Sequence, residues 1–165
     1  TKYSKAMNFT YTDENGKEQY PIMGCYGIGV GRMAASICEV RHDDYGPIWP
    51  ITIAPWQVHL CCLRSDDAEC KEKADEIYET LQNMGIEVIY DDRKARPGAM
   101  FADADLLGVP VRVVVSPRNL AENVVEISTR DKSIDKQKTP VDQAVTEVQN
   151  IINKLTADIN SKVNK

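Results

Sequence analysis

Apolar residues recur with two different spacings along the chain, and each spacing predicts one kind of element. Val58, Leu60 and Cys62 occupy every second position, which predicts a buried strand over residues 58–62. From residue 66 to residue 84 the apolar positions recur every three or four residues, which predicts an amphipathic helix. The same helical spacing predicts a final helix over residues 140–160.

Shorter apolar runs complete this pattern. They predict a short helix over 99–107, an edge strand over 137–139, and further strands over 86–90, 110–115 and 124–128. Ser65 or Asp66 is expected to cap the first long helix, and Thr139 with Asp142 the last one. Strands that alternate with helices predict an α/β fold, namely a mixed β-sheet flanked by helices.

The first 55 residues follow a different pattern. Asn15-Gly16 lies between two strand-like runs, 8–12 and 17–22, and therefore predicts a β-hairpin. A glycine-rich strand over 23–31 and a helix over 32–41 are expected next. Residues 42–55 contain three prolines, and we interpret them as a connection between domains. The expected division is part of one domain over 1–47, a linker over 48–55 and a second domain over 56–165.

The glycine-rich stretch carries the first candidate site. Gly27, Gly29 and Gly31 alternate with apolar residues, so in a strand they would leave one face bare. A flat ring such as a purine could lie on that face, and Arg32 offers a positive fork for phosphate. The spacing G-x-G-x-G differs from the G-x-G-x-x-G of dinucleotide-binding Rossmann enzymes. The alternative is a glycine-rich strand that packs on a helix without any ligand.

A charged loop after the strand over 86–90 carries the second candidate site. Arg93, Lys94 and Arg96 could bind phosphate, and Phe101 could stack on an unpaired base. The carboxylates of Asp92 and Asp103 could accept hydrogen bonds from base edges. The alternative is a solvated loop with internal salt bridges and with Phe101 in the core.

The cysteines and histidines suggest no metal or disulfide framework. The five cysteines include no C-x-x-C pair, which favours reduced thiols in a cytosol. The adjacent Cys61 and Cys62 should point to opposite faces of a strand, so zinc is not expected. Cys25 is better explained as a pocket-lining thiol than as a nucleophile. We interpret His59 as a core or edge histidine with its hydrogen bonds satisfied.

Charge and hydropathy limit the partners that the chain can attract. The 165 residues carry a net charge of −5, so an RNA contact must use a local basic patch. The acidic pair Asp43-Asp44 requires no function. No apolar run approaches the ~18 residues of a membrane span, and no signal peptide is visible.

Several motifs together resemble one family. Residues 23–32, Met-Gly-Cys-Tyr-Gly-Ile-Gly-Val-Gly-Arg, are similar to motif 3 of the class II aminoacyl-tRNA synthetases and most similar to the bacterial-type prolyl-tRNA synthetases. The resemblance continues in Ile48-Trp49-Pro50, Ile53-Ala54-Pro55, Asp91-Asp92-Arg93, Arg96-Pro97-Gly98 and Phe101-Ala102-Asp103. It implies the C-terminal part of such an enzyme, with the end of the catalytic domain and the anticodon-binding domain.

The resemblance also implies roles for individual residues. Arg32 would be the catalytic residue, in contact with the γ-phosphate of ATP, and Gly27, Gly29 and Gly31 would lie at the ATP. Gly24 and Cys25 would line the proline pocket. The anticodon contacts would be Asp92, Arg93, Arg96, Phe101 and Asp103.

The parent enzyme would be a cytoplasmic homodimer that attaches proline to its tRNA with ATP and Mg²⁺. The chain on its own would be inactive, because it lacks motifs 1 and 2. Two other interpretations stay open at this point: a catalytically inactive accessory RNA-binding module, and an unrelated Rossmann-type nucleotide-binding enzyme.

Overall fold

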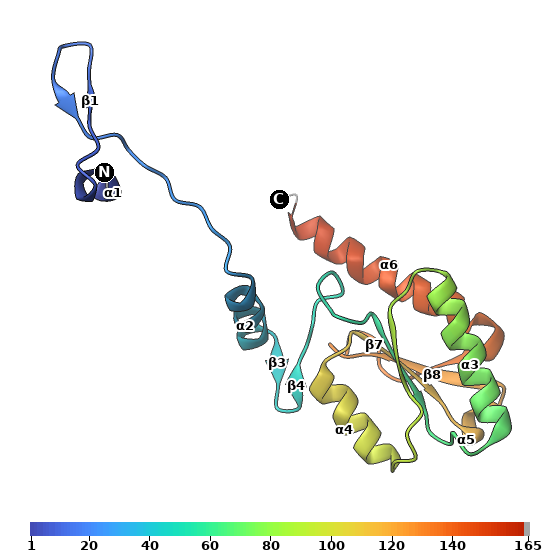
Figure 1. The fold of residues 1–165 in the computed structure, drawn as a ribbon. Coiled ribbons are helices and arrows are strands. Elements are labelled where there is room, and N and C mark those ends of the chain that lie inside the picture. Colours follow the sequence, from blue (N-terminus) through green and yellow to red (C-terminus); the bar gives the residue numbers. More distant parts are fainter. Residues whose placement is uncertain (164–165) are drawn as a thin grey trace. The chain divides into compact units, whose positions relative to one another are not determined.

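The structure is a computed structural model that describes residues 1–163. The chain divides into two compact units, Thr1–Ala34 and Ala35–Lys165 (Figure 1). Each unit is described by itself below.

The first unit contains a short helix and the predicted hairpin. Helix α1 spans Lys2–Ala6, and the antiparallel strands β1 and β2 span Tyr11–Thr12 and Glu18–Gln19. The carboxylate of Asp13 accepts hydrogen bonds from the backbone N–H groups of Asn15 and Lys17, both at 2.9 Å. These bonds hold the Asn15-Gly16 turn and confirm the hairpin prediction.

The predicted glycine-rich strand is wrong. Residues 20–29 are neither helix nor strand, and Gly31 lies inside helix α2, which spans Val30–Val40. A strand requires a neighbour for its backbone hydrogen bonds. Among residues 1–163, no strand pairs with this segment. The helix predicted over 32–41 is confirmed, with a start two residues earlier.

The second unit is built on a five-stranded sheet in the order β6-β5-β7-β8-β9. Strands β5 and β6 are parallel, as are β5 and β7, whereas β8 is antiparallel to both of its neighbours, β7 and β9. The mixed sheet and the edge position of β9 confirm the predictions. The strand bounds are Val58–Cys62 for β5, Val88–Asp91 for β6, Val111–Val115 for β7, Val124–Thr129 for β8 and Gln137–Pro140 for β9.

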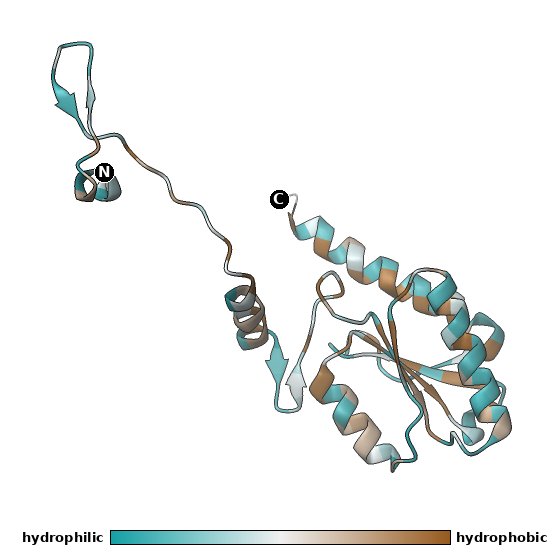
Figure 2. Ribbon diagram, viewed as in Figure 1, coloured by the Kyte–Doolittle hydropathy of each residue, from teal (hydrophilic) through white to brown (hydrophobic). Residues whose placement is uncertain are grey.

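Helices cover both faces of this sheet. Helices α3 (Ala68–Asn83) and α6 (Ala144–Val163) pack on one face and enclose the main core, and α4 (Pro97–Leu107) packs on the other. A 3-10 turn, Val141–Gln143, precedes α6, and a short helix α5 spans Pro117–Leu120. Figure 2 shows hydrophobic colouring along the central strands, which are buried between these layers.

The helix caps differ from the predicted ones. The side chain of Asp67, rather than Ser65 or Asp66, caps α3 by accepting from the N–H of Cys70 at 2.9 Å. The capping box of Thr139 with Asp142 is wrong, because Pro140 starts a 3-10 turn instead. The hydroxyl of Thr139 is buried and has no hydrogen-bond partner among the described residues.

The proline-containing connection is more ordered than expected. It contains a second hairpin, with strands β3 (His42–Asp43) and β4 (Gly46–Pro47), and this hairpin packs on the C-terminal end of α4. The backbones approach so closely that a Cβ on Gly108 would lie 2.3 Å from the carbonyl oxygen of Pro47. The hairpin therefore belongs to the second compact unit. Whether residues 48–55 also link two functional domains stays a prediction.

Candidate nucleic-acid interface

The charged loop between β6 and α4 is tied together by ion pairs. Arg93 donates to both carboxylate oxygens of Asp91, with Nε–Oδ1 and Nη2–Oδ2 distances of 2.8 Å. Its Nη2 also donates to Asp103 Oδ2 at 2.8 Å. The hydrogen bonds from Arg93 lower the pKa of Asp91, against the opposing effect of burial. Arg93 and Asp103 are therefore brought together, but each is partly neutralised by the other.

The remaining residues predicted for this site lie around the start of α4. Asp92 and Arg96 are exposed, and Arg96 occupies the N-cap position of the helix through its backbone. Phe101 is half-buried and packs against the small cluster of Cys61, Met100 and Val114. The guanidinium of Arg112 lies 5.2 Å from the centre of the Phe101 ring. The ring is thus part of a wall rather than a free stacking surface.

A groove of about 510 Å³ opens beside this wall, over the part of the sheet that α4 leaves uncovered. Its floor comes from alternate positions of β7 and β8, because the intervening residues face the main core. The side chains that line it are Leu63, Phe101, Arg112, Val114, Ser116, Arg118, Asn119, Glu126, Ser128, Lys136 and Lys138.

The sequence motifs predict only Phe101 among the residues that line this groove. Arg112 interrupts an apolar strand, and Glu126 and Ser128 alternate with Val125 and Ile127. That alternation is the signal that places them on the face opposite the core. Lys136 and Lys138 come from β9 and the loop before it, and no periodicity marks them.

The groove combines positive charge with hydrogen-bonding groups. Four basic side chains line it against one carboxylate, Glu126, which accepts from Asn119 Nδ2 at 2.9 Å. Lys138 pairs with Glu122, which lies outside the groove, and Arg112 pairs with Asp105 at 3.1 Å. Basic side chains on a concave surface suit a phosphate backbone, and the polar floor suits base edges.

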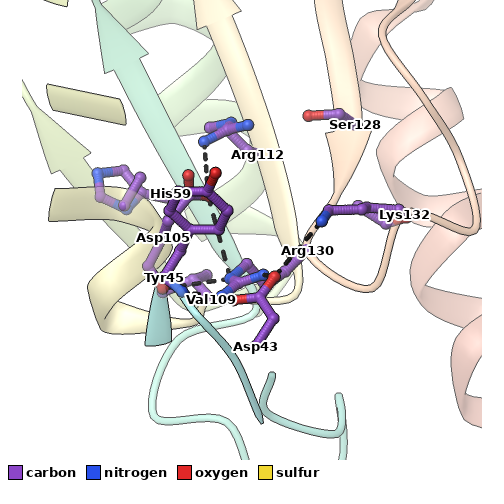
Figure 3. A pocket seen from close by; sticks show the side chains of 11 residues that line it. Asp43, Tyr45, His59, Asp105, Val109, Arg112, Ser128, Arg130 and Lys132 are labelled. Carbon is purple, nitrogen blue, oxygen red and sulfur yellow. Dashed lines mark hydrogen bonds and ion pairs between the residues drawn. The ribbon is translucent and has the colours of Figure 1, made fainter. Parts of the chain in front are cut away.

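A smaller cavity of about 120 Å³ lies next to the groove and shares Arg112 and Ser128 with it (Figure 3). Arg130 lies in its wall with only 4% of its side chain exposed. Its two Nη atoms donate to the two carboxylate oxygens of Asp43 at 2.8 and 2.6 Å, and Nη2 donates to the carbonyl of Gly46 at 3.0 Å. These bonds hold the pKa of Asp43 far below its usual range.

Asp43 is consequently a structural residue, a role that the sequence pattern does not predict. The ion pair joins residues 87 positions apart in the chain. Sequence spacing carries no signal for such a contact.

His59 also lines this cavity, and the expectation that its hydrogen bonds are satisfied is wrong. The side chain is 2% exposed, and neither ring nitrogen has a hydrogen-bond partner among the described residues. Asp91 Oδ2 lies 4.0 Å from Nε2, beyond hydrogen-bond distance. Burial lowers the pKa of His59 more than Asp91 raises it, so the ring is neutral at pH 7.

The candidate nucleotide residues lie in and after the extended segment. Gly24, Cys25, Gly27 and Gly29 lie in the irregular stretch, and Gly31 and Arg32 lie in the first turn of α2. A Cβ on Gly27 would meet no atom within 4 Å, so no packing within the described residues requires glycine there.

The described residues hold no group of three or more His, Cys, Asp or Glu side chains that could bind a metal ion. Cys61 and Cys62 do face opposite sides of β5, since they belong to different core clusters. None of the helices within residues 1–163 has the length and apolar character needed to cross a membrane.

Residues 57–151 match the family described as the anticodon binding domain. The chain belongs to this family. The matched range includes all five strands of the sheet, the loop of Arg93 and every residue that lines the groove. The family confirms the anticodon-binding domain that the sequence motifs led us to expect.

Curated relatives extend the similarity to most of the chain. The protein named proline–tRNA ligase from Syntrophus aciditrophicus is 47% identical over 150 residues, which are 90% of this chain and 26% of the relative. Proteins of the same name from Geobacillus sp. (strain WCH70) and Treponema denticola are 46% and 45% identical, over 92% and 96% of this chain. The chain spans about a quarter of the length of these relatives.

Solved structures show the same fold. A prolyl-tRNA synthetase from Cryptosporidium parvum, complexed with halofuginone and AMPPNP, covers 98% of this chain with a TM-score of 0.69 and 20% identity, and 34% of that protein is matched. The same enzyme complexed with L-proline and AMP gives a TM-score of 0.70 over 35% of its length. The mixed α/β architecture is therefore that of this group.

Proposed function

We propose that this chain is part of a proline–tRNA ligase and that its basic groove binds the anticodon loop of proline tRNA. The supporting observation is that the groove lies entirely within the matched anticodon binding domain. Residues 56–165 carry 15 basic and 19 acidic side chains. A domain of net negative charge has little general attraction for RNA, so binding depends on the local cluster in the groove.

The proposal assigns different tasks to the groove and to the loop before α4. Arg118 and Lys136 would contact phosphates, and Glu126 on the floor would accept hydrogen bonds from a base edge. Of the earlier candidates, Phe101 lines the groove itself, and Asp92, Arg93, Arg96 and Asp103 would form the adjoining rim. Since Arg93 and Asp103 already pair with each other, their contribution to binding is expected to be smaller.

The parent enzyme would activate proline with ATP and transfer it to the 3′ end of the tRNA. Residues 1–47 would then belong to its catalytic domain, with Gly27, Gly29 and Gly31 beneath the adenosine and Gly24 and Cys25 in the proline pocket. Arg32 would hold the γ-phosphate and stabilise charge during the transfer. Mg²⁺ would accompany ATP as part of the substrate. We further propose a cytoplasmic homodimer.

The second candidate is an accessory RNA-binding module without catalysis. It would keep the groove but would have no requirement for glycine at positions 27 and 29. Proline-dependent pyrophosphate exchange by the full-length protein, together with its loss on substitution at those glycines, therefore distinguishes the two functions.

The proposal is tested by titrating the purified chain with anticodon stem-loops of proline tRNA. Arg118→Ala should weaken binding and flatten its salt dependence by about one counterion, as expected when one phosphate contact is removed. Lys71→Ala is the matched control, because Lys71 is an exposed lysine on α3, which covers the opposite face of the sheet. Equal loss in both variants would contradict a specific groove.

Base preference gives a second readout. All proline anticodons share two guanines, and guanine offers two donors on its Watson–Crick edge, which a carboxylate can accept. Guanine-to-adenine changes in the stem-loop should therefore weaken binding to the wild type but much less to Glu126→Gln. Equal affinity for all stem-loops would leave the groove an ordinary basic surface.

A further inference from the structure

A continuous series of contacts runs from the β3–β4 hairpin to the wall of the groove (Figure 3). Arg130 binds the hairpin through Asp43, and its Nε donates to the backbone carbonyl of Asp105 at 3.2 Å. The same Nε lies 4.0 Å from the Asp105 carboxylate, which accepts from Arg112 at 3.1 Å. Arg112 in turn covers the ring of Phe101 in the groove.

We propose that Arg130 is a positioning residue for the groove, one that makes docking of the hairpin and binding of RNA depend on each other. Asp105 lies in the last turn of α4, where carbonyl groups lack partners within the helix. Arg130 supplies a donor to that carbonyl and a positive charge beside the carboxylate. Asp105 is thereby held where it fixes Arg112 over Phe101. The RNA part of this inference rests on the function proposed above.

Only an arginine fits this position. Its planar fork reaches Asp43, Gly46 and Asp105 at once, which three rotatable donors on one lysine nitrogen cannot do. Lys132 provides a natural comparison, because its Nζ lies 3.4 Å from the same Asp43 and its side chain is 74% exposed. No hydrogen bond or ion pair joins Lys132 to Asp105 within the described part of the chain. Its removal should therefore leave Arg112 in place.

The contact of Arg112 with Asp105 can be followed in the NMR signal of the Arg112 guanidinium, which donates to Asp105 from Nη1 and is assigned with Arg112→Lys. In Arg130→Lys and in the isosteric Asp43→Asn, this signal should shift and its hydrogen exchange should accelerate at least about fivefold. In Lys132→Met both should match the wild type. If Arg112 is unchanged in Arg130→Lys and Asp43→Asn while their melting temperatures fall, Arg130 is only a structural clamp and the inference is wrong.

RNA binding tests the coupling in the other direction. Arg130→Lys should lower the affinity for a proline anticodon stem-loop about fivefold or more, and Lys132→Met less than about twofold. Because coupling is reciprocal, the stem-loop should slow amide exchange over residues 42–48 in the wild type but not in Arg130→Lys. A wild-type chain that binds no stem-loop would overturn the proposed function, whereas the Arg112 signal would still decide whether Arg130 positions it.

Discussion

At the scale of single residues, His59 is a buried polar side chain whose burial costs stability. Both ring nitrogens are buried, and no protein atom among the described residues accepts from or donates to them. Charged side chains surround it without pairing with it: Asp91 favours its protonation, whereas Arg112 and Arg93 oppose it. Burial has the largest effect and keeps the ring neutral. An apolar side chain of similar size would avoid this cost.

We therefore expect His59→Leu to leave stability unchanged or raise it by about 1–2 kcal/mol at pH 7.5. The pKa of His59 is lower in the fold than its ordinary value of 6.5, so protons bind more tightly to the unfolded chain. Wild-type stability should accordingly fall as the pH drops below about 6.5, and this part of the fall should be absent in the variant. Urea denaturation at pH 7.5 and pH 5 measures both effects.

The control for this prediction is His42→Gln. His42 is exposed, so the variant should keep the pH dependence of the wild type. If His59→Leu lost as much stability between pH 7.5 and pH 5 as the wild type, the buried imidazole would not be its cause.

At the scale of elements, α4 contacts both the groove and the β3–β4 hairpin. Its start follows the ion-paired loop of Arg93, its middle carries Phe101, and its end receives the β3–β4 hairpin. The hairpin contact needs two glycines, since a Cβ on Gly46 would lie 2.8 Å from the carbonyl of Asp105 and one on Gly108 would meet Pro47. The position of this helix therefore depends on residues outside the helix.

Gly108→Ala should destabilise the chain by about 2–4 kcal/mol. This figure adds the cost of an alanine at a positive φ of 70° to the cost of its clash with the backbone of Pro47. Gly85→Ala is matched to it, because Gly85 has a φ of 78° but a Cβ there would meet nothing within 4 Å. That variant should lose only about 1 kcal/mol. Thermal or urea denaturation compares the two, and equal losses would mean that the close approach to Pro47 contributes nothing.

The same elements show what the sequence could predict. The strands of the sheet and helices α3, α4 and α6 were predicted within a few residues, because Val58, Leu60 and Ile77 follow periods that depend only on local geometry. The sequence pattern predicts only a connection over residues 42–47, because this hairpin is held by contacts with Arg130 and α4, which are distant in the chain. The strand over 23–31 was wrong for the complementary reason, since a strand exists only with a partner.

The candidate site was predictable to a similar extent. The loop around Arg93 was recognised because its charges are consecutive in the chain. The groove was not, because Arg112, Glu126 and Lys138 become neighbours only when three strands lie side by side. The pairing of Arg93 with Asp91 and Asp103 agrees with the alternative of internal salt bridges, but the sequence could not decide between that alternative and a free cation.

At the scale of the whole molecule, the chain spans about a quarter of the length of its curated relatives, and its two units differ in burial. Ser4 is the one buried residue of the first 34, whereas Ile22, Tyr26 and Ile28 are each at least 75% exposed. Burial of apolar side chains away from water stabilises a folded domain, so such exposure is unfavourable. The proposed function accounts for their exposure by placing this segment within a larger catalytic domain.

In a full-length enzyme that contains this chain, Arg32→Ala should reduce proline activation by roughly 2–4 kcal/mol of transition-state stabilisation, with little effect on folding. Gly29→Val should be comparably damaging, because a branched side chain would fill the face proposed for the adenosine. Proline-dependent pyrophosphate exchange measures both. The 165 residues alone should give no exchange above a blank.

Normal exchange by Arg32→Ala would show that this arginine does not bind phosphate. If Gly29→Val were equally active, the face beside Gly29 would not be the adenosine site, whereas no exchange by the wild-type full-length protein would support the accessory module.

The five cysteines differ in burial, so the number of thiols that react with a reagent reports how far the chain has unfolded. Cys61, Cys62 and Cys70 are fully buried, and burial raises the pKa of Cys61 and of Cys70 to about 12, whereas Cys25 is exposed and Cys38 is half-exposed. A thiol reagent attacks only an accessible thiolate. Alkylation of the native chain should therefore stop at two added groups, and up to three further groups should be added when the second unit opens. The mass spectrum alone would therefore report opening of the second unit, which holds all three buried cysteines, without an attached dye.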